Sequence, residues 1–236
     1  MFHNLKKDPS LHVTICISGW LSESFNTNIE WFHLRSFGQG MTYNLRWDSG
    51  STQQLLSQDL KSIAKQIYSA ARSNPSTQIS TFYNILNTDP FKKAAMNAES
   101  TGKMLAKLIK EGTFKNACVS LVGFSLGTLI IYYCLKELEG EAYINDVVLL
   151  GGAAPLKVAS WEKIRRTVKG RLVNTYCKTD RVLSILYTLT KFKKPIGIQE
   201  IPVAGIENYN VSHLTSGHLS YRTALDKILQ LINFNS

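Results

Sequence analysis

A serine flanked by two glycines stands near the centre of the sequence, in the pentapeptide Gly123-Phe124-Ser125-Leu126-Gly127. An apolar run ends just before it and another begins just after it, which is typical of a buried strand that leads into a buried helix. On such a tight turn a G-x-S-x-G sequence lifts the serine hydroxyl clear of the sheet, where it can act as a nucleophile. Glycines at Gly123 and Gly127 are also typical of close helix–strand packing without any chemistry.

A serine nucleophile needs a general base, and histidine is the usual one. In hydrolases built on this turn, the chain order is the serine, then an acid, then the histidine. Two of the five histidines, His213 and His218, follow Ser125, and the other three precede it. His218 comes directly after Gly217 and just before the last expected helix, so it is favoured as the base. His213 is the alternative.

The acid that orients the base should lie at the carboxyl end of a strand. Asp180 follows the strand expected at 172–177 and is the favoured candidate, although it would serve equally well as the N-cap of the next helix. Glu207, in the segment leading to the histidines, is the alternative. Asp146 begins its strand, at the wrong edge of the sheet, and Asp226 lies inside the last expected helix.

Two backbone N–H groups are expected to form an oxyanion hole beside the serine. One belongs to Leu126, the residue after the nucleophile, and the other to the loop after the first expected strand. In that loop Trp20 is the first candidate and Leu21 the second, and Gly19 lets the backbone approach closely.

Together these residues predict a serine hydrolase that cleaves carboxylic esters through an acyl-enzyme, with no metal and no organic cofactor. Trp20, Phe124 and Leu126 are expected to give the site an apolar lining, which favours a lipase- or esterase-like enzyme with acyl lipids as substrates. Two other hypotheses remain open: a thioesterase or peptidase, and a catalytically inactive module of the same fold that binds lipids or a membrane surface.

The elements that would position these residues alternate along the chain. This alternation predicts an α/β fold, an open and mostly parallel sheet of about six strands with helices on both faces. We expect one domain over residues 1–236, in which the polar, turn-rich segment 74–90 forms a small lid or loop insertion. The expected strands are 11–18, 41–47, 117–122, 144–150, 172–177 and 197–201, and the expected helices are 22–34, 53–72, 91–111, 126–138, 161–168, 182–189 and 220–232.

The 236 residues include 27 basic and 17 acidic ones, a net charge of +10. The basic residues, among them Lys191, Lys193 and Lys194, are most simply interpreted as solvated faces, and an anionic membrane surface as a partner is the alternative hypothesis. Without a nucleic-acid-binding motif, no nucleic acid is expected. The first residues lack the apolar run of a signal peptide, and no stretch of about 18 apolar residues would span a bilayer. We therefore expect a protein of the cytoplasm or of a membrane surface.

Four cysteines lie inside apolar segments and none belongs to a metal-binding spacing. We expect Cys16, Cys118, Cys134 and Cys177 to be reduced and buried, as in a reducing compartment.

Several segments, in order along nearly the whole chain, resemble a known family: CISGWL at 16–21, the pentapeptide at 123–127, NDVVLLGG at 145–152, GRLVNTY at 170–176, Asp180, GIEN at 205–208 and GHLSYR at 217–222. The sequence is similar to the transmembrane and coiled-coil domain-containing hydrolase family, long labelled a domain of unknown function. This resemblance implies an α/β-hydrolase fold, a triad on Ser125, Asp180 and His218, a lipase- or esterase-like activity and membrane association in many members. The chain departs from the family at Arg181, where a tryptophan usually follows the acid, and lacks the upstream membrane segments.

Overall fold

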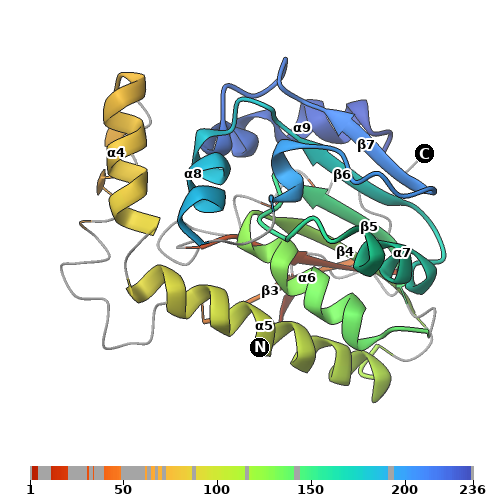
Figure 1. Cartoon of the computed structure of the whole chain (residues 1–236). Coiled ribbons are helices and arrows are strands. Elements are labelled where there is room, and N and C mark those ends of the chain that lie inside the picture. The colour runs from red at the N-terminus through yellow and green to blue at the C-terminus, as the bar shows by residue number, and fades with distance from the viewer. Residues whose placement is uncertain are drawn as a thin grey trace.

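Apolar, β-branched runs form a central sheet whose strands are nearly all parallel (Figure 1). The computed structural model describes residues 2–4, 12–20, 31, 34, 40–48, 62, 65, 66, 69, 70, 73–86, 89–114, 117–140, 144–190 and 194–234. In these residues the strands follow the order β1-β3-β2-β4-β5-β6-β7 across one sheet. Of the strands in the described part of the chain, β1 is antiparallel to its neighbour and the other pairs are parallel. The strands are β1 (Phe2–Asn4), β2 (His12–Ile17), β3 (Met41–Leu45), β4 (Cys118–Phe124), β5 (Ile144–Leu150), β6 (Leu172–Tyr176) and β7 (Ile206–Asn210).

Helices follow most of the strands and cover the sheet from both sides. The described helices are α4 (Pro75–Leu86), α5 (Asp89–Lys110), α6 (Leu126–Glu137), α7 (Val158–Thr167), α8 (Arg181–Thr190), α9 (Tyr221–Leu231) and the short 3₁₀ helices η2 (Ile196–Ile198) and η3 (His218–Ser220). In the described part of the chain, no helix combines the length and the apolar character needed to cross a bilayer.

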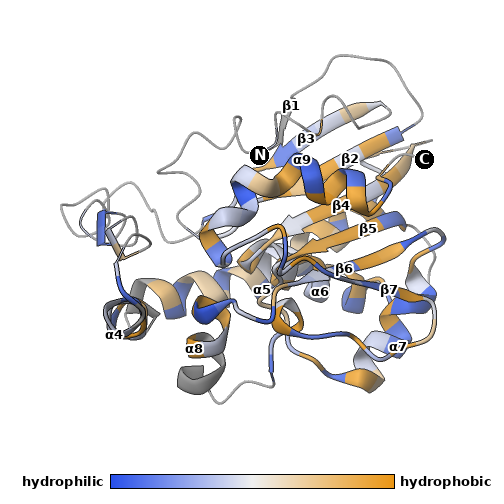
Figure 2. Cartoon of the chain, turned by 90° about the horizontal axis from the view of Figure 1, so that it is seen from above, coloured by the Kyte–Doolittle hydropathy of each residue, from blue (hydrophilic) through white to orange (hydrophobic). Residues whose placement is uncertain are grey.

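Alternate residues of the central strands β2, β4, β5 and β6 belong to two apolar cores, as the period of a strand requires. On β4, for example, Leu121 packs into the core beneath α5 and α6, whereas Val122 packs into the core beneath α9. The strands lie between α9 on one side and the pair α5 and α6 on the other (Figure 1), and seen from above, α9 lies over strands that are largely apolar (Figure 2). The predicted open, mostly parallel sheet with helices on both faces is therefore confirmed. Its carboxyl edge is the place where loops of such folds build sites.

The last predicted strand, 197–201, is wrong. Ile196–Ile198 form a 3₁₀ helix instead, and the edge strand is Ile206–Asn210, parallel to β6. Pro202 has no N–H to donate to a neighbouring strand. Gly197 lies against the backbone of Gly152 and donates its N–H to the Gly152 carbonyl at 2.8 Å. Close packing of two loops thus overrides the apolar pattern that suggested a strand.

The segment expected to be rich in turns contains a helix, α4. Asn74 is its N-cap, since its Oδ1 accepts the N–H of Thr77 at 3.0 Å, and Pro75 takes the first helical position, which proline favours. These start signals were present in the sequence but were hidden by its polar composition. The helix stands beside α8, away from the central sheet (Figure 1).

Other predictions concern segments outside the described residues and the four cysteines. Most of the helix expected at 22–34 and most of that expected at 53–72 lie outside the described residues, as do Leu21, Lys191 and Lys193. All four cysteines are free. The expectation that all four are buried is wrong for Cys118, which is exposed because it begins β4 at the amino edge of the sheet.

At that amino edge, Arg171 joins β7 to the end of α9. Its guanidinium donates to both carboxylate oxygens of Glu207, at 2.8 and 2.7 Å, and to the carbonyls of Ile232 and Asn233, at 2.7 and 2.9 Å. These carbonyls end the helix and would otherwise lack intrahelical donors. The hydrogen bonds from Arg171 lower the pKa of Glu207.

We expect Arg171→Met to lower the free energy of unfolding at pH 7 by about 1–3 kcal/mol, since it breaks a bidentate ion pair and uncaps α9. The lowered pKa of Glu207 means that its contribution is complete above the ordinary pKa of glutamate and is lost as the pH falls below it. The difference from wild type should therefore shrink in acid. Urea unfolding at pH 7 and at pH 3.5 measures both effects.

Lys103→Met provides the control, because Lys103 forms an exposed ion pair with Glu99 on one helix. Its cost should stay below about 0.5 kcal/mol. Equal costs for the two variants at pH 7 would contradict the role given to Arg171.

Candidate active site

The turn between β4 and α6 forces Ser125 into an unusual backbone conformation. Its φ is 54° and its ψ is −121°, and in the described chain only Asn233 is another non-glycine residue with a positive φ. Such a conformation costs roughly 1–3 kcal/mol and persists only where its surroundings impose it. Ser125 lies directly after a buried strand and directly before Leu126, the first residue of α6.

The flanking glycines are required by packing. A Cβ on Gly123 would come 2.6 Å from Cδ1 of Ile131, and a Cβ on Gly127 would overlap the carbonyl oxygen of Ile17 at the end of β2. No larger side chain fits at either position without moving the helix or the strand. This close approach brings the start of α6 against the carboxyl end of the sheet.

Hydrogen bonds hold the turn on both sides of Ser125. Its N–H donates to the carbonyl of Leu150 at 3.1 Å. Its own carbonyl accepts the N–H of Thr128 at 3.1 Å, the Thr128 hydroxyl at 2.7 Å and the N–H of Ala153 at 3.2 Å. Sequence reasoning did not identify Thr128, although a threonine three residues after such a serine can donate back to its carbonyl.

The structure brings Ser125, Asp180 and His218 together. His218 Nε2 lies 2.8 Å from Ser125 Oγ, and His218 Nδ1 lies 2.7 Å from Asp180 Oδ2. A carboxylate only accepts hydrogen bonds, so Nδ1 carries the proton and, in the neutral ring, Nε2 accepts the serine hydroxyl. Asp180 is fully buried and His218 is 7% exposed, so little water competes for these bonds.

Both partners come from the loops at the carboxyl edge that the sequence indicated. Asp180 ends the loop after β6, and its other oxygen, Oδ1, accepts the N–H of Leu183 at 3.0 Å. Asp180 therefore also caps α8, the structural role that its position suggested. His218 begins η3 after Gly217, whose φ of 151° lies in a region that only glycine adopts readily.

Aromatic rings fix the plane of the imidazole. The ring of Phe124 stacks on that of His218, with centroids 5.0 Å apart and planes 27° apart, and Tyr221 packs against both rings. Burial, and then the nearby charge of Asp180, raise the pKa of Tyr221. Tyr221 therefore stays protonated and neutral beside the acid.

The loop after β2 approaches the serine as closely as a backbone can. A Cβ on Gly19 would lie 2.9 Å from Ser125 Cβ and 3.4 Å from Ser125 Oγ. The predicted oxyanion donors are the N–H groups of Trp20 and Leu126. Trp20 follows Gly19 in this loop and Leu126 follows Ser125, so both residues belong to the two backbone segments that meet here. The first N–H groups of a helix such as α6 have no partner within the helix, so that of Leu126 suits this task.

Two tryptophans that sequence reasoning missed hold this loop in place. Trp47 Nε1 donates to the carbonyl of Ser18 at 3.1 Å, and Trp31 Nε1 donates to the Ser18 hydroxyl at 2.7 Å. The ring of Trp20 packs edge-on against Phe91 of α5, with centroids 5.1 Å apart. The loop is anchored on both sides of Gly19.

The alternative base and acid lie apart from this group. His213 is exposed. Glu207 is held by Arg171 at the amino edge of the sheet, and Asp146 accepts the N–H of Arg171 at 2.6 Å in the same region. Neither acid forms a hydrogen bond with His218.

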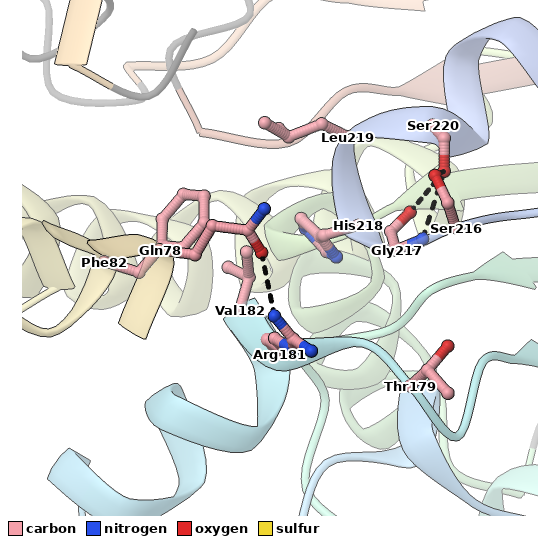
Figure 3. Close-up of a pocket in the computed structure, with 10 residues that line it drawn as sticks. All are labelled: Gln78, Phe82, Thr179, Arg181, Val182, Ser216, Gly217, His218, Leu219 and Ser220. Atoms are coloured by element: carbon pink, nitrogen blue, oxygen red, sulfur yellow. Dashed lines mark hydrogen bonds between the residues drawn. The ribbon is translucent and has the colours of Figure 1, made fainter. Parts of the chain in front are cut away.

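A pocket of about 480 Å³ opens beside His218 (Figure 3). Its walls are the start of α8, the loop and 3₁₀ helix around His218, and two residues of α4, Gln78 and Phe82. The residues expected to line the site, Trp20, Phe124 and Leu126, do not line this pocket. In the described chain no group of histidine, cysteine and acidic side chains is arranged to hold a metal ion.

The strain at Ser125 gives a testable prediction about stability. Glycine relieves a positive φ and alanine does not, so Ser125→Gly should be more stable than Ser125→Ala by about 1 kcal/mol, after allowing for the greater unfolded entropy of glycine. Guanidinium unfolding of the two variants measures the difference. An alanine variant at least as stable as the glycine variant would show that the turn is not strained.

Parts of the chain are similar to curated proteins of other organisms. The chain is 38% identical over 144 residues to the transmembrane and coiled-coil domain-containing protein STS1 of Oryza sativa subsp. japonica, covering 59% of this chain and 22% of that protein. It is 35% identical over 150 residues to the probable lipase MIL1 of Saccharomyces cerevisiae, covering 61% of this chain and 14% of that protein. The chain thus spans less than a quarter of either relative.

Among solved structures, MenH from S. aureus is 12% identical, with a TM-score of 0.48 over 98% of this chain and 96% of that chain. The parallel sheet, the strained turn after β4 and the chain order of serine, aspartate and histidine are those of the α/β-hydrolase fold. The family resemblance seen in the sequence is confirmed as well. Residues 1–235 match the family model described as "Protein of unknown function (DUF726)", and the chain belongs to that family.

Proposed function

We propose that this domain is a serine hydrolase that cleaves carboxylic esters with Ser125 as nucleophile, His218 as general base and Asp180 as the acid that orients the base. One observation carries the proposal: the unbroken chain of hydrogen bonds from Ser125 Oγ through the imidazole to the buried carboxylate, at 2.8 and 2.7 Å. A binding module would not need this chain, nor the strained turn that presents the serine.

Acylation follows from the protonation states that the geometry favours. His218 Nε2 takes the hydroxyl proton as Ser125 Oγ attacks the carbonyl carbon of the ester. The carbonyl oxygen becomes an oxyanion, which accepts hydrogen bonds from the N–H groups of Leu126 and Trp20. Asp180 stabilises the imidazolium that forms and itself stays ionised. When the tetrahedral intermediate collapses, the proton on Nε2 passes to the leaving alkoxide, and an acyl-serine remains.

Deacylation reverses these roles with water as the nucleophile. His218 Nε2 removes a proton from water, the hydroxide oxygen attacks the acyl carbon, and the same two N–H groups stabilise the second oxyanion. Collapse returns the proton to Ser125 Oγ and releases the carboxylic acid. His218 can serve in both halves because its ring is fixed by Asp180 on one side and by stacked Phe124 on the other.

Acyl lipids are the proposed substrates. Phe82, Val182 and Leu219 give apolar surface to the pocket beside His218, and Leu219 is 39% exposed at its edge. An apolar edge next to the base suits an acyl chain that reaches the site from a lipid surface. The name of one relative, probable lipase, supports the same substrate class. We place the activity in the cytoplasm or on a membrane surface.

The kinetics of triad variants test the proposal. Ser125→Ala, His218→Gln and Asp180→Asn should each lower kcat/KM for p-nitrophenyl butyrate by about 10³-fold or more, because the three side chains act as a unit. Combining two of the substitutions should add little further loss. Release of p-nitrophenolate, followed by absorbance, measures each rate.

The variants of the base and of the acid each have a matched control in the alternative residues. His213→Gln and Glu207→Gln, compared at a temperature at which all proteins are folded, should keep kcat/KM within about twofold of wild type, since neither side chain contacts the triad. The proposal is wrong if the controls lose as much activity as the triad variants, or if Ser125→Ala retains wild-type turnover.

A further inference from the structure

Arg181 belongs to the pocket beside His218 but has no part in the mechanism described above. It directly follows Asp180, begins α8 and lines the same pocket as His218. Because Asp180 is fixed by His218 and by the N–H of Leu183, the backbone of Arg181 is fixed relative to the serine as well. In Figure 3 its guanidinium lies near the start of α8 and points toward Gln78 of α4, to which a hydrogen bond joins it.

The positive charge of Arg181 is not neutralised by the pocket. Its side chain is exposed, and in the described part of the chain it forms no salt bridge. Its hydrogen bond goes to a neutral acceptor, Gln78 Oε1, at 3.3 Å. Besides Arg181, Gln78 and His218, the polar side chains of the lining are the hydroxyl groups of Thr179, Ser216 and Ser220. Among the residues that the structure describes, no carboxylate lines the pocket.

A guanidinium in such a setting suits an oxyanion. It has five donors in a planar fork that matches carboxylate and phosphate oxygens, and one long hydrogen bond to an amide leaves most of this capacity unused. Hydroxyl groups can add further donors to the same anion. Since no described carboxylate forms part of the lining, an incoming anion meets no acidic side chain on the pocket wall.

Resting on the proposed ester hydrolysis, we propose that Arg181 selects substrates that carry an anionic group, a carboxylate or a phosphate, close to the ester that Ser125 attacks. Arg181 is then a specificity-determining residue and contacts the substrate away from the reacting atoms. The substrate class becomes narrower: acyl esters with an anionic acyl end or an anionic leaving group, rather than neutral glycerides.

A purely structural role predicts different behaviour. If Arg181 only joins α8 to α4 through Gln78, then Gln78→Leu should have the same effect as Arg181→Met. If the charge itself selects the substrate, Gln78→Leu should leave the selectivity intact. Arg166→Met removes an exposed arginine of α7 that does not line the pocket and controls for net charge.

Two pairs of esters, matched in chain length, separate the two sources of negative charge. One pair is 1-butyrylglycerol and its 3-phosphate, and the other is p-nitrophenyl pentanoate and p-nitrophenyl hemiglutarate. For at least one pair, wild type should favour the anionic member in kcat/KM by at least about tenfold, the size of one charge-assisted hydrogen bond. Arg181→Met should reduce that ratio to about one, mainly by raising KM for the anionic ester, and Arg181→Lys should keep part of it.

The ratio of kcat/KM between the anionic and the neutral ester should stay at the wild-type value in Gln78→Leu and in Arg166→Met. Ratios near one for wild type in both pairs would overturn the inference, and so would an unchanged ratio in Arg181→Met or an equal loss in Gln78→Leu. If wild type hydrolyses the neutral esters without charge preference, only the inference about Arg181 fails, and the proposed hydrolase stands.

If no ester is hydrolysed, the proposed function is wrong. In that case a binding measurement still tests whether Arg181 binds the anionic group. Calorimetric titration of Ser125→Ala with 1-butyrylglycerol 3-phosphate should give measurable binding. The dissociation constant should rise at least about tenfold in the double variant that carries both Ser125→Ala and Arg181→Met. Thermal melts establish that both proteins are folded. No binding to Ser125→Ala, or equal binding by both proteins, would overturn the inference.

Discussion

The backbone at Ser125, held at a φ of 54°, is the constraint on which the site depends. A chain that leaves β4 and enters α6 in one residue must turn sharply, and it can do so only where both neighbours two positions away lack a Cβ. The conformation is unfavourable by itself, but it is fixed by four hydrogen bonds to the N–H and carbonyl of Ser125. Each contributes about 0.5–1.5 kcal/mol, so together they match or exceed the strain.

Asp180 connects this turn to the rest of the carboxyl edge. One oxygen holds the imidazole of His218 and the other caps α8, so the acid, the base and the first turn of α8 form one rigid group. Removing the carboxylate would loosen the base and the helix together. The same arrangement fixes Arg181 beside the pocket, and α4 packs on α8 from outside. The proposed chemistry and the proposed substrate selection thus both depend on one buried side chain.

Those parts of the site that depend on short motifs could be predicted from the sequence. A glycine-flanked serine after an apolar strand, an aspartate after a later strand and Gly217-His218 before the last helix could be placed in order along a parallel sheet, and the structure brings their side chains together. Their chemical roles remain a proposal. The parallel sheet itself followed from the alternation of apolar runs, whose period differs between strand and helix.

What the sequence did not reveal depends on contacts between distant segments. Trp47 anchors a carbonyl 29 residues away, and Arg181 bonds to Gln78, 103 residues earlier, so no short motif contains either pair. The edge strand β7 was misplaced because Gly197 packs against another loop, a contact that outweighs local β preference. Thr128 is the exception: it lies three residues from Ser125, and its spacing could have identified it.

The nucleophilic role of Ser125 is the central claim, and covalent trapping tests it most directly. The protein is treated with a fluorophosphonate and digested with trypsin, and the adduct is located by fragment-ion mass spectrometry. The peptide 116–136 contains two serines, so the fragments distinguish Ser125 from Ser120 on the strand. The account predicts a single phosphonyl group on Ser125, lost in His218→Gln and retained in His213→Gln. An unlabelled protein, or an adduct on any other serine with Ser125 unmodified, would contradict it.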